Sequence, residues 1–504
     1  MNANGEIGPL NFQFDFLSVP SRRLAVSIDC PMNVALADTS RRKTPLVEML
    51  LLAGPTVAQM ASYTLMQFID TWMLSHFGSN KITGLEPTAA SNSGMLSFAL
   101  ISIGFGTLMV VNTLVSQCFG RGDRRGCGQY LWQGIWFALL YSAVLLTLLP
   151  VARSIFRMFG HAEMLVDVEA TYLRIMIAGA GLKLVQVAFS QFMLAIDRPF
   201  AVLMATIIGV SMNALAAWIF IYGKLGLSPM GIRGSALGQN VGVFIEMVTL
   251  ILLACRHDTR LNYHLNEWKF RWGQFRTMLA VGLPSGAQLT ADVLAWSLFS
   301  VWVMAPFGTE TMAANAFTFR FYSVSFMPAY GLSTAVTALV GRYIGAGKPD
   351  VAMQRARLGF ILAAAYMLGC GLLFFLGRHQ LLKLFTSNPE ILRIGSTLLV
   401  YASIYQFFDA MYIIYNGALR GAGDTLVPAI ATMTLCWGIT VAGGRAIATY
   451  LPQFGAGGPW VASTIYGILL GSFSYLRFKR GGWRSIHLNS TASKAEAVPV
   501  TVTG

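Results

Sequence analysis

Three carboxyl groups interrupt long apolar stretches of this chain: Asp70, Asp292 and Asp409. An ionised carboxylate at bilayer depth costs at least about 2.5–3.5 kcal/mol, so such residues usually face a cavity, a partner or an ion path. At about 100° per residue, each acid shares a sector of roughly 80° with amide, hydroxyl or aromatic side chains of its own helix. These neighbours are Gln59, Tyr63 and Gln67 for Asp70; Ser285, Gln288, Trp296 and Phe299 for Asp292; and Tyr401, Tyr405, Tyr412 and Asn416 for Asp409.

This combination of acids and aromatic rings indicates an interior cavity for an organic cation. Aromatic faces attract cations, and desolvation strengthens both that attraction and the pull of a carboxylate. The alternative is that the acids only form structural ion pairs with buried bases. Arg320 is the obvious charge partner for Asp292 or Asp409, and the other bases inside apolar stretches are Arg174, Lys183 and Arg445.

The elements that carry these residues are long and apolar. The chain has 504 residues, of which 55% are hydrophobic and only 12% charged, about half the charged fraction of a soluble domain. A membrane-spanning helix needs about 20 mainly apolar residues, and six such segments precede residue 256 and six follow it. Because the segments are much longer than barrel strands, we predict an all-α polytopic membrane protein with twelve transmembrane helices.

The two halves of the chain repeat each other in order. "GPTVAQ" parallels "LPSGAQ", "LVSQCFGRG" parallels "LVGRYIGAG", and "MGIRGSA" parallels "FGAGGPW", at a nearly constant spacing along the chain. Six helices per half is an even number, so the repeats are parallel and related by a pseudo-two-fold axis along the membrane normal. We therefore expect an N-terminal tail (1–43), an N lobe with helices 1–6 (44–255), a linker (256–276), a C lobe with helices 7–12 (277–480) and a C-terminal tail (481–504).

The net charge of +14 follows the turns between helices. In the turns and the residues that flank the helices, Lys and Arg number 21 on the side of the N-terminus and 8 on the opposite side. The positive-inside rule then places both termini in the cytoplasm, as in a multi-pass protein of the inner membrane. This distribution argues against a nucleic-acid partner, and the six scattered cysteines indicate neither a disulfide framework nor a metal site.

Two prolines occupy matching positions in the first helix of each half, Pro55 and Pro284. Proline removes a backbone hydrogen bond and kinks a helix. Each position is therefore either a static bend or a hinge, and the sequence leaves both readings open.

Several motifs resemble those of the multidrug and toxic compound extrusion (MATE) transporters, in family order from about Pro45 to Arg480. They are "FIDTWMLSHFG", "LVSQCFGRGD", "WIFIYGKLG", "LVGRYIGAGK" and "GALRGAGDT". The resemblance, closest to the NorM-like branch, implies two six-helix lobes and export of cationic or amphipathic compounds in exchange for H⁺ or Na⁺. It places the family's acids at Asp70, Asp292 and Asp409, with Na⁺ at the latter two as the alternative to H⁺.

One position departs from a related pattern. The DinF-like branch of the family carries an Asp before its "PIFIYG" motif, where this chain has Ala217, with Asn213 one turn earlier. This favours the C-lobe acids as the main coupling site. The expected binding set is Gln288, Tyr405, Tyr412 and Asn416 with the three acids; we expect small organic cations and membrane lipid as partners, no cofactor, no structural metal and function as a monomer.

The sequence also allows two other functions to be considered for a protein of this architecture. A flippase for a lipid-linked oligosaccharide or other lipid shares this lobed architecture, but it needs a basic cavity, for which Arg320 and Arg445 are the candidates. A membrane-embedded enzyme needs a nucleophile–base pair or a metal set, and the sequence has no HExxH, GxSxG or Walker A motif. The sequence thus names no catalytic residue.

Overall fold

The computed structural model describes residues 44–77, 85–486 and 488. The expected N-terminal tail and most of the C-terminal tail lie outside these residues. From Pro45 onward the chain forms one compact unit, and its regular elements in the described residues are all helical.

The first half supplies six helical rods. They are α2 (Pro45–Ser75), α3 (Leu85–Leu108) continued by α4 (Val110–Arg121), α5 (Arg124–Leu146), α7 (Glu163–Ala178) continued by α8 (Ala180–Ala195), α9 (Pro199–Tyr222) and α10 (Ile232–Ala254); the short α6 (Ala152–Met158) follows α5.

The second half repeats this plan after the short linker helix α11 (His257–Asn262). Its rods are α12 (Trp272–Leu298) with the π-helix η1 (Phe299–Val303) and the 3₁₀ turn η2 (Ala305–Phe307), α13 (Thr309–Gly345), α14 (Pro349–Lys383), α15 (Pro389–Ala422), α16 (Leu426–Leu435) with the π-helix η3 (Cys436–Gly443) and α17 (Gly444–Tyr450), and α18 (Gly457–Arg480); η4 (Pro452–Phe454) precedes α18 and η5 (Gly482–Ser485) follows it.

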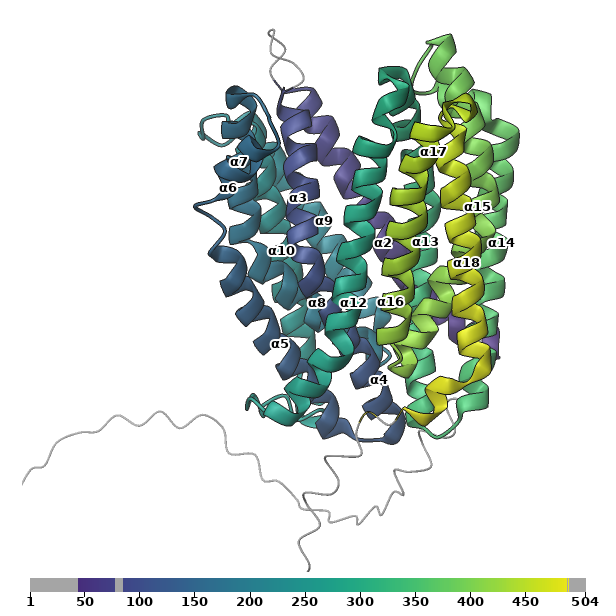
Figure 1. Cartoon of the computed structure of the whole chain (residues 1–504). Coiled ribbons are helices and arrows are strands. Elements are labelled where there is room, and N and C mark those ends of the chain that lie inside the picture. The colour runs from purple at the N-terminus through teal and green to yellow at the C-terminus, as the bar shows by residue number, and fades with distance from the viewer. Residues whose placement is uncertain (1–43, 78–84, 487, 489–504) are drawn as a thin grey trace, which may run out of the picture. The chain divides into compact units, whose positions relative to one another are not determined.

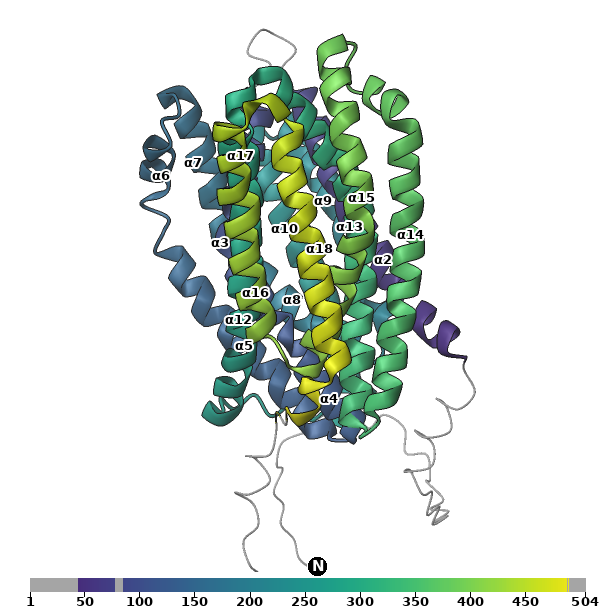
Figure 2. The same cartoon turned by 45° about the vertical axis from the view of Figure 1, so that its right-hand side comes forward.

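The predicted fold class is confirmed: twelve rods in two six-helix lobes. Eight helices of the described chain are long and apolar enough to cross a membrane, and the bent pair α7–α8 makes a ninth. In Figure 1 most of the purple-to-blue helices lie to the left and the green-to-yellow helices to the right, and Figure 2 shows the C-lobe helices from another side. We call the side where α2 begins and α18 ends the proximal side, and the other the distal side.

The first helix of each lobe starts in the other lobe. Met49, Leu52 and Ala53 of α2 belong to the apolar cluster of α13–α15, and the Thr56 hydroxyl donates to the Gly331 carbonyl of α13 at 2.9 Å. Figure 1 shows the purple α2 passing behind the green helices before it joins the blue ones. The start of α12 packs on the N lobe in the same way, through Met278 and Val281. The lobe boundary at 256–276 therefore stays a prediction from the chain's repeat.

The fourth rod of the N lobe bends by 44° between α7 and α8. Gly179 lies at the bend, and a Cβ there would collide with the Asn240 side chain of α10. The Asn240 amide donates to the Ile175 carbonyl at 2.8 Å. The glycine and the asparagine together allow the bend and satisfy a backbone group near it.

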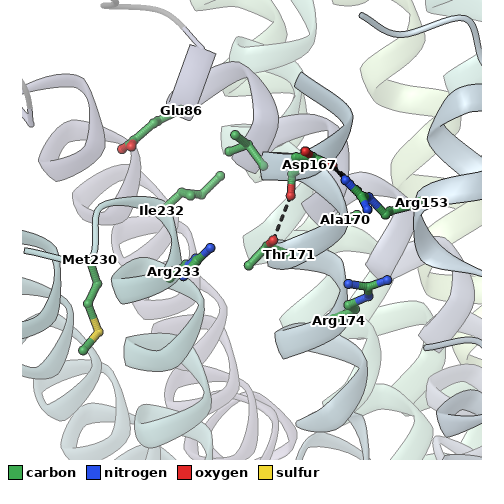
Figure 3. A pocket seen from close by; sticks show the side chains of 10 residues that line it. Glu86, Arg153, Asp167, Ala170, Thr171, Arg174, Met230, Ile232 and Arg233 are labelled. Carbon is green, nitrogen blue, oxygen red and sulfur yellow. Dashed lines mark hydrogen bonds and ion pairs between the residues drawn. The ribbon is translucent and has the colours of Figure 1, made fainter. Parts of the chain in front are cut away.

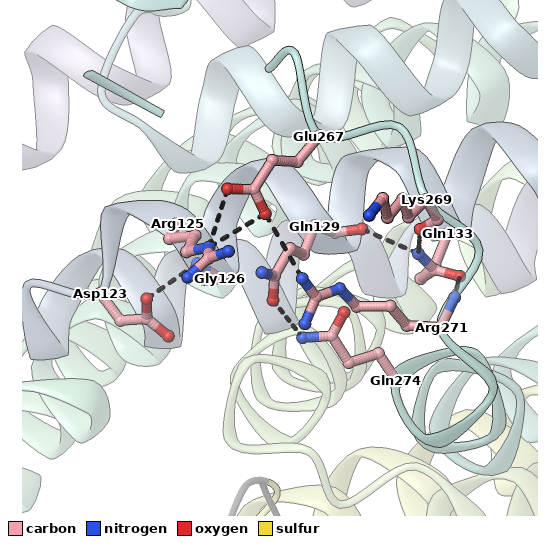
Figure 4. Close-up of polar contacts among 9 residues, drawn as sticks. All are labelled: Asp123, Arg125, Gly126, Gln129, Gln133, Glu267, Lys269, Arg271 and Gln274. Atoms are coloured by element: carbon pink, nitrogen blue, oxygen red, sulfur yellow. Dashed lines mark hydrogen bonds and ion pairs between the residues drawn. The ribbon is translucent and has the colours of Figure 1, made fainter. Parts of the chain in front are cut away.

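The linker between the lobes is bound to α5, as Figure 4 shows. Trp132 and Trp136 donate from their indole nitrogens to the Leu265 and Trp268 carbonyls at 2.9 and 3.1 Å. The Glu267 carboxylate accepts from Arg125 at 2.9 Å and from Arg271 at 3.3 Å. The basic linker is thus a folded part of the proximal surface.

The C-terminal tail, predicted to start at 481, begins as ordered structure. The Trp483 side chain is buried, stacks on Phe478 and donates to the Phe478 carbonyl at 2.8 Å. Arg484 pairs with Asp350 at 2.8 Å. The large apolar indole explains why the chain stays packed beyond α18.

Candidate functional site

Two carboxyl groups lie in the interior of the C lobe. The Asp409 side chain of α15 is buried and accepts a hydrogen bond from the Tyr322 hydroxyl of α13 at 2.8 Å. Asp292 of α12 is half-buried and accepts from Tyr412 at 3.2 Å and from Tyr466 at 3.4 Å. Tyr412 lies on α15 three residues after Asp409, so its bond to Asp292 brings the two acids into one site.

An amide and a hydroxyl extend this network. The Gln288 side chain donates to the Tyr412 hydroxyl at 3.1 Å and to the Thr432 hydroxyl of α16 at 2.9 Å. The Cys436 thiol, at the first residue of η3, lies next to the Asp292 carboxyl group. π-Helical turns often occur at functional sites because they shift side chains out of the α-helical register, and here one brings Cys436 against an acid.

Aromatic rings surround the two acids. Trp296 and Tyr322 lie edge-on to Tyr405, with ring centroids at 6.2 and 5.8 Å, and Trp296 lies 6.4 Å from Tyr466. Such rings present an electron-rich face that attracts cations. The structure therefore brings together Asp292, Asp409, Gln288, Tyr405 and Tyr412 as one polar and aromatic cluster.

Two sequence-predicted residues stand apart from this cluster. Arg320 of α13 is exposed, and in the described part of the chain no ion pair joins it to Asp292, Asp409 or any other acid. The ion pair that the sequence left open is therefore absent from this structure. Asn416 lies on the same helix as Asp409, but no hydrogen bond of the described residues connects it to either acid.

The other bases inside apolar stretches are also held away from these acids. Arg174 donates to the Leu149 carbonyl at 3.2 Å, and Arg445 donates to the Trp302 carbonyl at 3.1 Å. The C-lobe carboxyl groups thus have hydroxyl partners and no basic partner among the residues described.

Asp70 occupies a separate position in the N lobe. Its buried carboxylate accepts from the Asn213 amide of α9 and the Gln239 amide of α10, both at 3.0 Å. Asn213 lies one turn from the position where a related branch carries an Asp, and its amide donates a hydrogen bond directly to Asp70. Within the described residues, Gln67 and Gln59 of the predicted stripe make no hydrogen bond to Asp70; Gln59 donates instead to Thr206 at 3.2 Å.

Sequence reasoning missed several partners because they lie on other helices. Tyr322, Tyr466 and Gln239 each bond to a predicted acid. It also missed Glu246, an acid in the apolar helix α10 whose side chain is 2% exposed. The signal was present, since Glu246 meets the same test as the three acids: a carboxyl group within a long apolar stretch.

A cavity of about 450 Å³ lies apart from these acids, on the distal side of the N lobe (Figure 3). Its charged lining is mixed: Glu86, Arg153, Asp167, Arg174 and Arg233. Arg153 is paired with Asp167, so the cavity presents no uniform field for either sign of ligand.

The sequence matches the MatE family over residues 55–219 and 291–443. The chain belongs to the MatE family. The two matched segments cover more than half of the chain, and they include Asp70, Asp292 and Asp409. The ranges 1–54, 220–290 and 444–504 fall outside the match.

MatE relatives are similar along most of their length. The "Probable multidrug resistance protein NorM" of Thermotoga maritima is 26% identical over 444 residues, which is 86% of this chain and 92% of that protein. A NorM protein of the same description from Pseudomonas syringae pv. tomato is 29% identical over 438 residues, 84% of this chain and 91% of that protein. The NorM-like resemblance predicted from the motifs is confirmed.

Solved MatE-like structures share the fold. An outward-facing multidrug resistance MATE family transporter superposes with a TM-score of 0.79 at 19% identity, over 87% of this chain and 96% of that one. A transporter of the MOP superfamily from Pyrococcus furiosus, described as having a binding pocket of reverse polarity, gives the same TM-score, identity and coverage. A likeness at this level of identity shows the fold alone, so the function must be argued from the side chains.

Proposed function

We propose that this protein is a cation-coupled antiporter that exports cationic or amphipathic organic compounds by alternating access. One observation supports this above the others: Asp292 and Asp409 lie in one interior cluster, bonded to tyrosine hydroxyls and to no base within the described residues. The relatives described as multidrug resistance proteins support the same class of substrate. Family membership points to transport, and no catalytic residue is proposed.

The chemistry of exchange follows from these two acids. Carboxyl groups without a basic partner attract either a coupling ion, H⁺ or Na⁺, or an organic cation that the aromatic rings also hold. When the coupling ion neutralises the acids, the organic cation is released. One charge that moves through 100 mV supplies about 2.3 kcal/mol, roughly a fiftyfold concentration ratio. Metal and organic cations are here substrates of the exchange.

The orientation is part of the proposal. The excess of Lys and Arg in the proximal turns, 21 against 8, supports a cytoplasmic location for both termini in the inner membrane. We also propose that a single copy suffices, since both lobes come from one chain.

Efflux of ethidium from cells tests the proposal. Asp409→Asn keeps the shape of the side chain but removes its charge, so we expect gradient-driven efflux to fall at least roughly tenfold while expression is unchanged. Proteoliposomes with Na⁺ and H⁺ gradients imposed separately identify the ion. Undiminished, gradient-dependent efflux by the variant would remove Asp409 from the mechanism.

A lipid flippase is the weaker proposal. It would need basic side chains that face the interior, whereas Arg320 is exposed and Arg445 is bonded to a backbone carbonyl. Purified protein that binds an anionic lipid analogue in preference to ethidium would favour the flippase and overturn the antiporter.

A further inference from the structure

Glu246 is a buried carboxylate that the proposed exchange does not use. One oxygen, Oε1, accepts three hydrogen bonds: from the Tyr63 hydroxyl of α2 at 2.6 Å, from the Thr206 hydroxyl of α9 at 2.7 Å and from the Gln186 amide of α8 at 2.9 Å. Four helices therefore converge on this acid. A carboxylate held this way inside a membrane is costly and needs a physical reason.

The arrangement repeats the C-lobe site helix by helix. In each lobe a glutamine of the first helix donates to a threonine of the fifth, Gln59 to Thr206 at 3.2 Å and Gln288 to Thr432 at 2.9 Å. In each lobe the fourth helix contributes a group that bonds to the acid of the cluster, the Gln186 amide in the N lobe and the Tyr412 hydroxyl in the C lobe.

The positions of the acid and of one tyrosine are exchanged between the two lobes. In the C lobe the first helix carries the acid and the sixth helix the hydroxyl, in the pair Asp292 and Tyr466. In the N lobe the first helix carries Tyr63 and the sixth helix Glu246. Tyr63 and Asp292 are as far apart in the sequence as the two matching prolines of the repeat are. The Glu246 cluster is therefore the N-lobe counterpart of the Asp292 cluster.

A lysine faces this acid. The Lys183 ammonium group lies over the Tyr63 ring, 4.8 Å from its centroid, and Glu246 acts on it electrostatically. In the described chain no hydrogen bond or ion pair holds this ammonium group, so only the ring and the field of Glu246 keep it in place. An ammonium group on an aromatic face occupies the position that a bound cation would take.

The cluster around Glu246 also contains a side-chain carbonyl oxygen that is free to bind a cation or to accept a hydrogen bond. The Gln186 side chain is 1% exposed and its Oε1 has no hydrogen-bond partner among the described residues, although its amide nitrogen donates to both Tyr63 and Glu246. A buried carbonyl oxygen without a partner beside a carboxylate and two hydroxyl oxygens is suited to a monovalent cation or to a protonated carboxyl group. The titratable groups that face Glu246 are Tyr63 from α2 and Lys183 from α8, while α9 presents the uncharged Thr206.

We propose that Glu246 is the acid of a second cation-exchange site, in which the Lys183 ammonium group rests while the coupling ion is absent and from which it is displaced when the ion, H⁺ or Na⁺, arrives. The inference rests on the antiport proposed above. It adds an ion site to the N lobe, distinct from Asp70 and from the C-lobe acids.

The test measures how many ions accompany each substrate. The full chain is reconstituted in proteoliposomes with ethidium as the organic cation, and the ion gradient at which net ethidium movement reverses gives the coupling number. In Glu246→Gln we expect this number to fall by one ion. Glu169→Gln is the matched control, because Glu169 is an equally buried N-lobe acid that bonds to Asn92 and His161 outside the cluster.

Lys183→Met provides a second measurement on a protein that keeps Glu246. Methionine lacks the ammonium group that competes with the coupling ion for Glu246. The half-saturating concentration of the coupling ion should therefore fall roughly 3- to 30-fold. A coupling number in Glu246→Gln equal to that of the wild type would overturn the inference, and so would unchanged half-saturation in Lys183→Met if Glu246→Gln fails to fold. Wild-type protein that moves no ethidium along either gradient would instead refute the antiport itself.

Discussion

At the residue scale, the protein stabilises its C-lobe acids with tyrosine hydroxyls. The Tyr322 hydroxyl donates to Asp409 at 2.8 Å. A hydroxyl stabilises a charged carboxylate but brings no countercharge, so the site keeps its attraction for a cation. The bond competes with the coupling ion for the same oxygen.

Tyr322→Phe therefore strengthens ion binding. A hydrogen bond to a charged group is worth about 1.5–3 kcal/mol, so its loss should lower the half-saturating concentration of the coupling ion roughly tenfold or more in ethidium efflux. Tyr366→Phe is the control, because that hydroxyl bonds to the Val324 carbonyl at the lipid-facing surface of α14. Equal half-saturation in the wild type and Tyr322→Phe would show that this bond does not oppose the ion.

Projection of the sequence onto a single helix can identify residues that share a helix face, but it cannot identify residues of different helices that contact each other. Tyr405 and Tyr412 were predicted to lie beside Asp409 on α15, and the structure places them in the same cluster as the acids. Tyr322 and Tyr466 could not be predicted, because helix periodicity carries no information on which neighbouring helix packs against a given face. The coupling role of all these residues stays a prediction.

At the scale of elements, two N-lobe acids lie along one seam of α2, α9 and α10. Three pairs of site residues are each seven positions apart: Tyr63 with Asp70, Thr206 with Asn213, and Gln239 with Glu246. Seven residues are about two turns, so the residues of each pair share a helix face and lie about 10 Å apart along it. Glycines between the two acids let α9 and α10 approach closely.

Gly242→Ala separates these helices. The added Cβ would lie 2.6 Å from Asn213 Cβ and 2.8 Å from the Gly209 carbonyl oxygen, and overpacking of this kind costs about 1–3 kcal/mol. We expect a lower thermal midpoint in detergent. Gly369→Ala, at a helical position of α14 with nothing within 4 Å, should instead raise stability by about 0.5–1 kcal/mol; the same shift in both variants would contradict the close packing.

The linker offers a test of pH dependence outside the membrane-spanning helices. The hydrogen bond from Arg125 lowers the pKa of Glu267 below the ordinary carboxyl value. Its stabilising contribution is therefore complete above that ordinary value and is lost as the pH falls through the lower value of the folded protein.

In the wild type we expect hydrogen exchange in residues 263–271 to accelerate about two- to fivefold over that acidic range, after correction for intrinsic rates. Glu267→Gln should exchange at the faster rate throughout and show no such transition. A transition of the same size in the variant would assign the pH dependence to another group.

At the scale of the whole molecule, several close contacts between the two lobes lie on the proximal side. Thr113 and Gln117 of α4 donate to the Arg420 and Gly421 carbonyls of α15 at 2.9 and 3.0 Å. Gly120 of α4 lies directly against the Arg342 carbonyl of α13, with no room for a Cβ. Closure on this side therefore depends on backbone contacts between the lobes.

Gly120→Ala should separate the lobes on the proximal side and bring their distal ends together. If the lobes rock as rigid bodies, spin labels at the exposed Met158 and Leu384 will shift toward shorter distances in electron paramagnetic resonance. Gly54→Ala, where a Cβ meets nothing within 4 Å, should leave the distribution unchanged. An unchanged distribution in Gly120→Ala would show that this contact does not hold the lobes.

The repeat in the sequence predicted two lobes of six helices, and the structure confirms that architecture. The sequence repeat alone could not show that α2 and α12 each begin in the opposite lobe. A repeat records which segments correspond, whereas the packing of each segment depends on side chains from both halves, such as Met49 and Leu52 against α13.

The start of α2 in the C lobe also affects the order in which the protein matures. Thr56 precedes its partner Gly331 by 275 residues, which a ribosome needs about 15–55 s to add at the usual rate of elongation. During that time the N-lobe helices are complete, but the first half of α2 lacks the surface that it covers in the finished molecule. The first of the described helices is thus among the last to complete its packing, so nascent chains shorter than about α13 expose Met49, Leu52 and Ala53 to lipid.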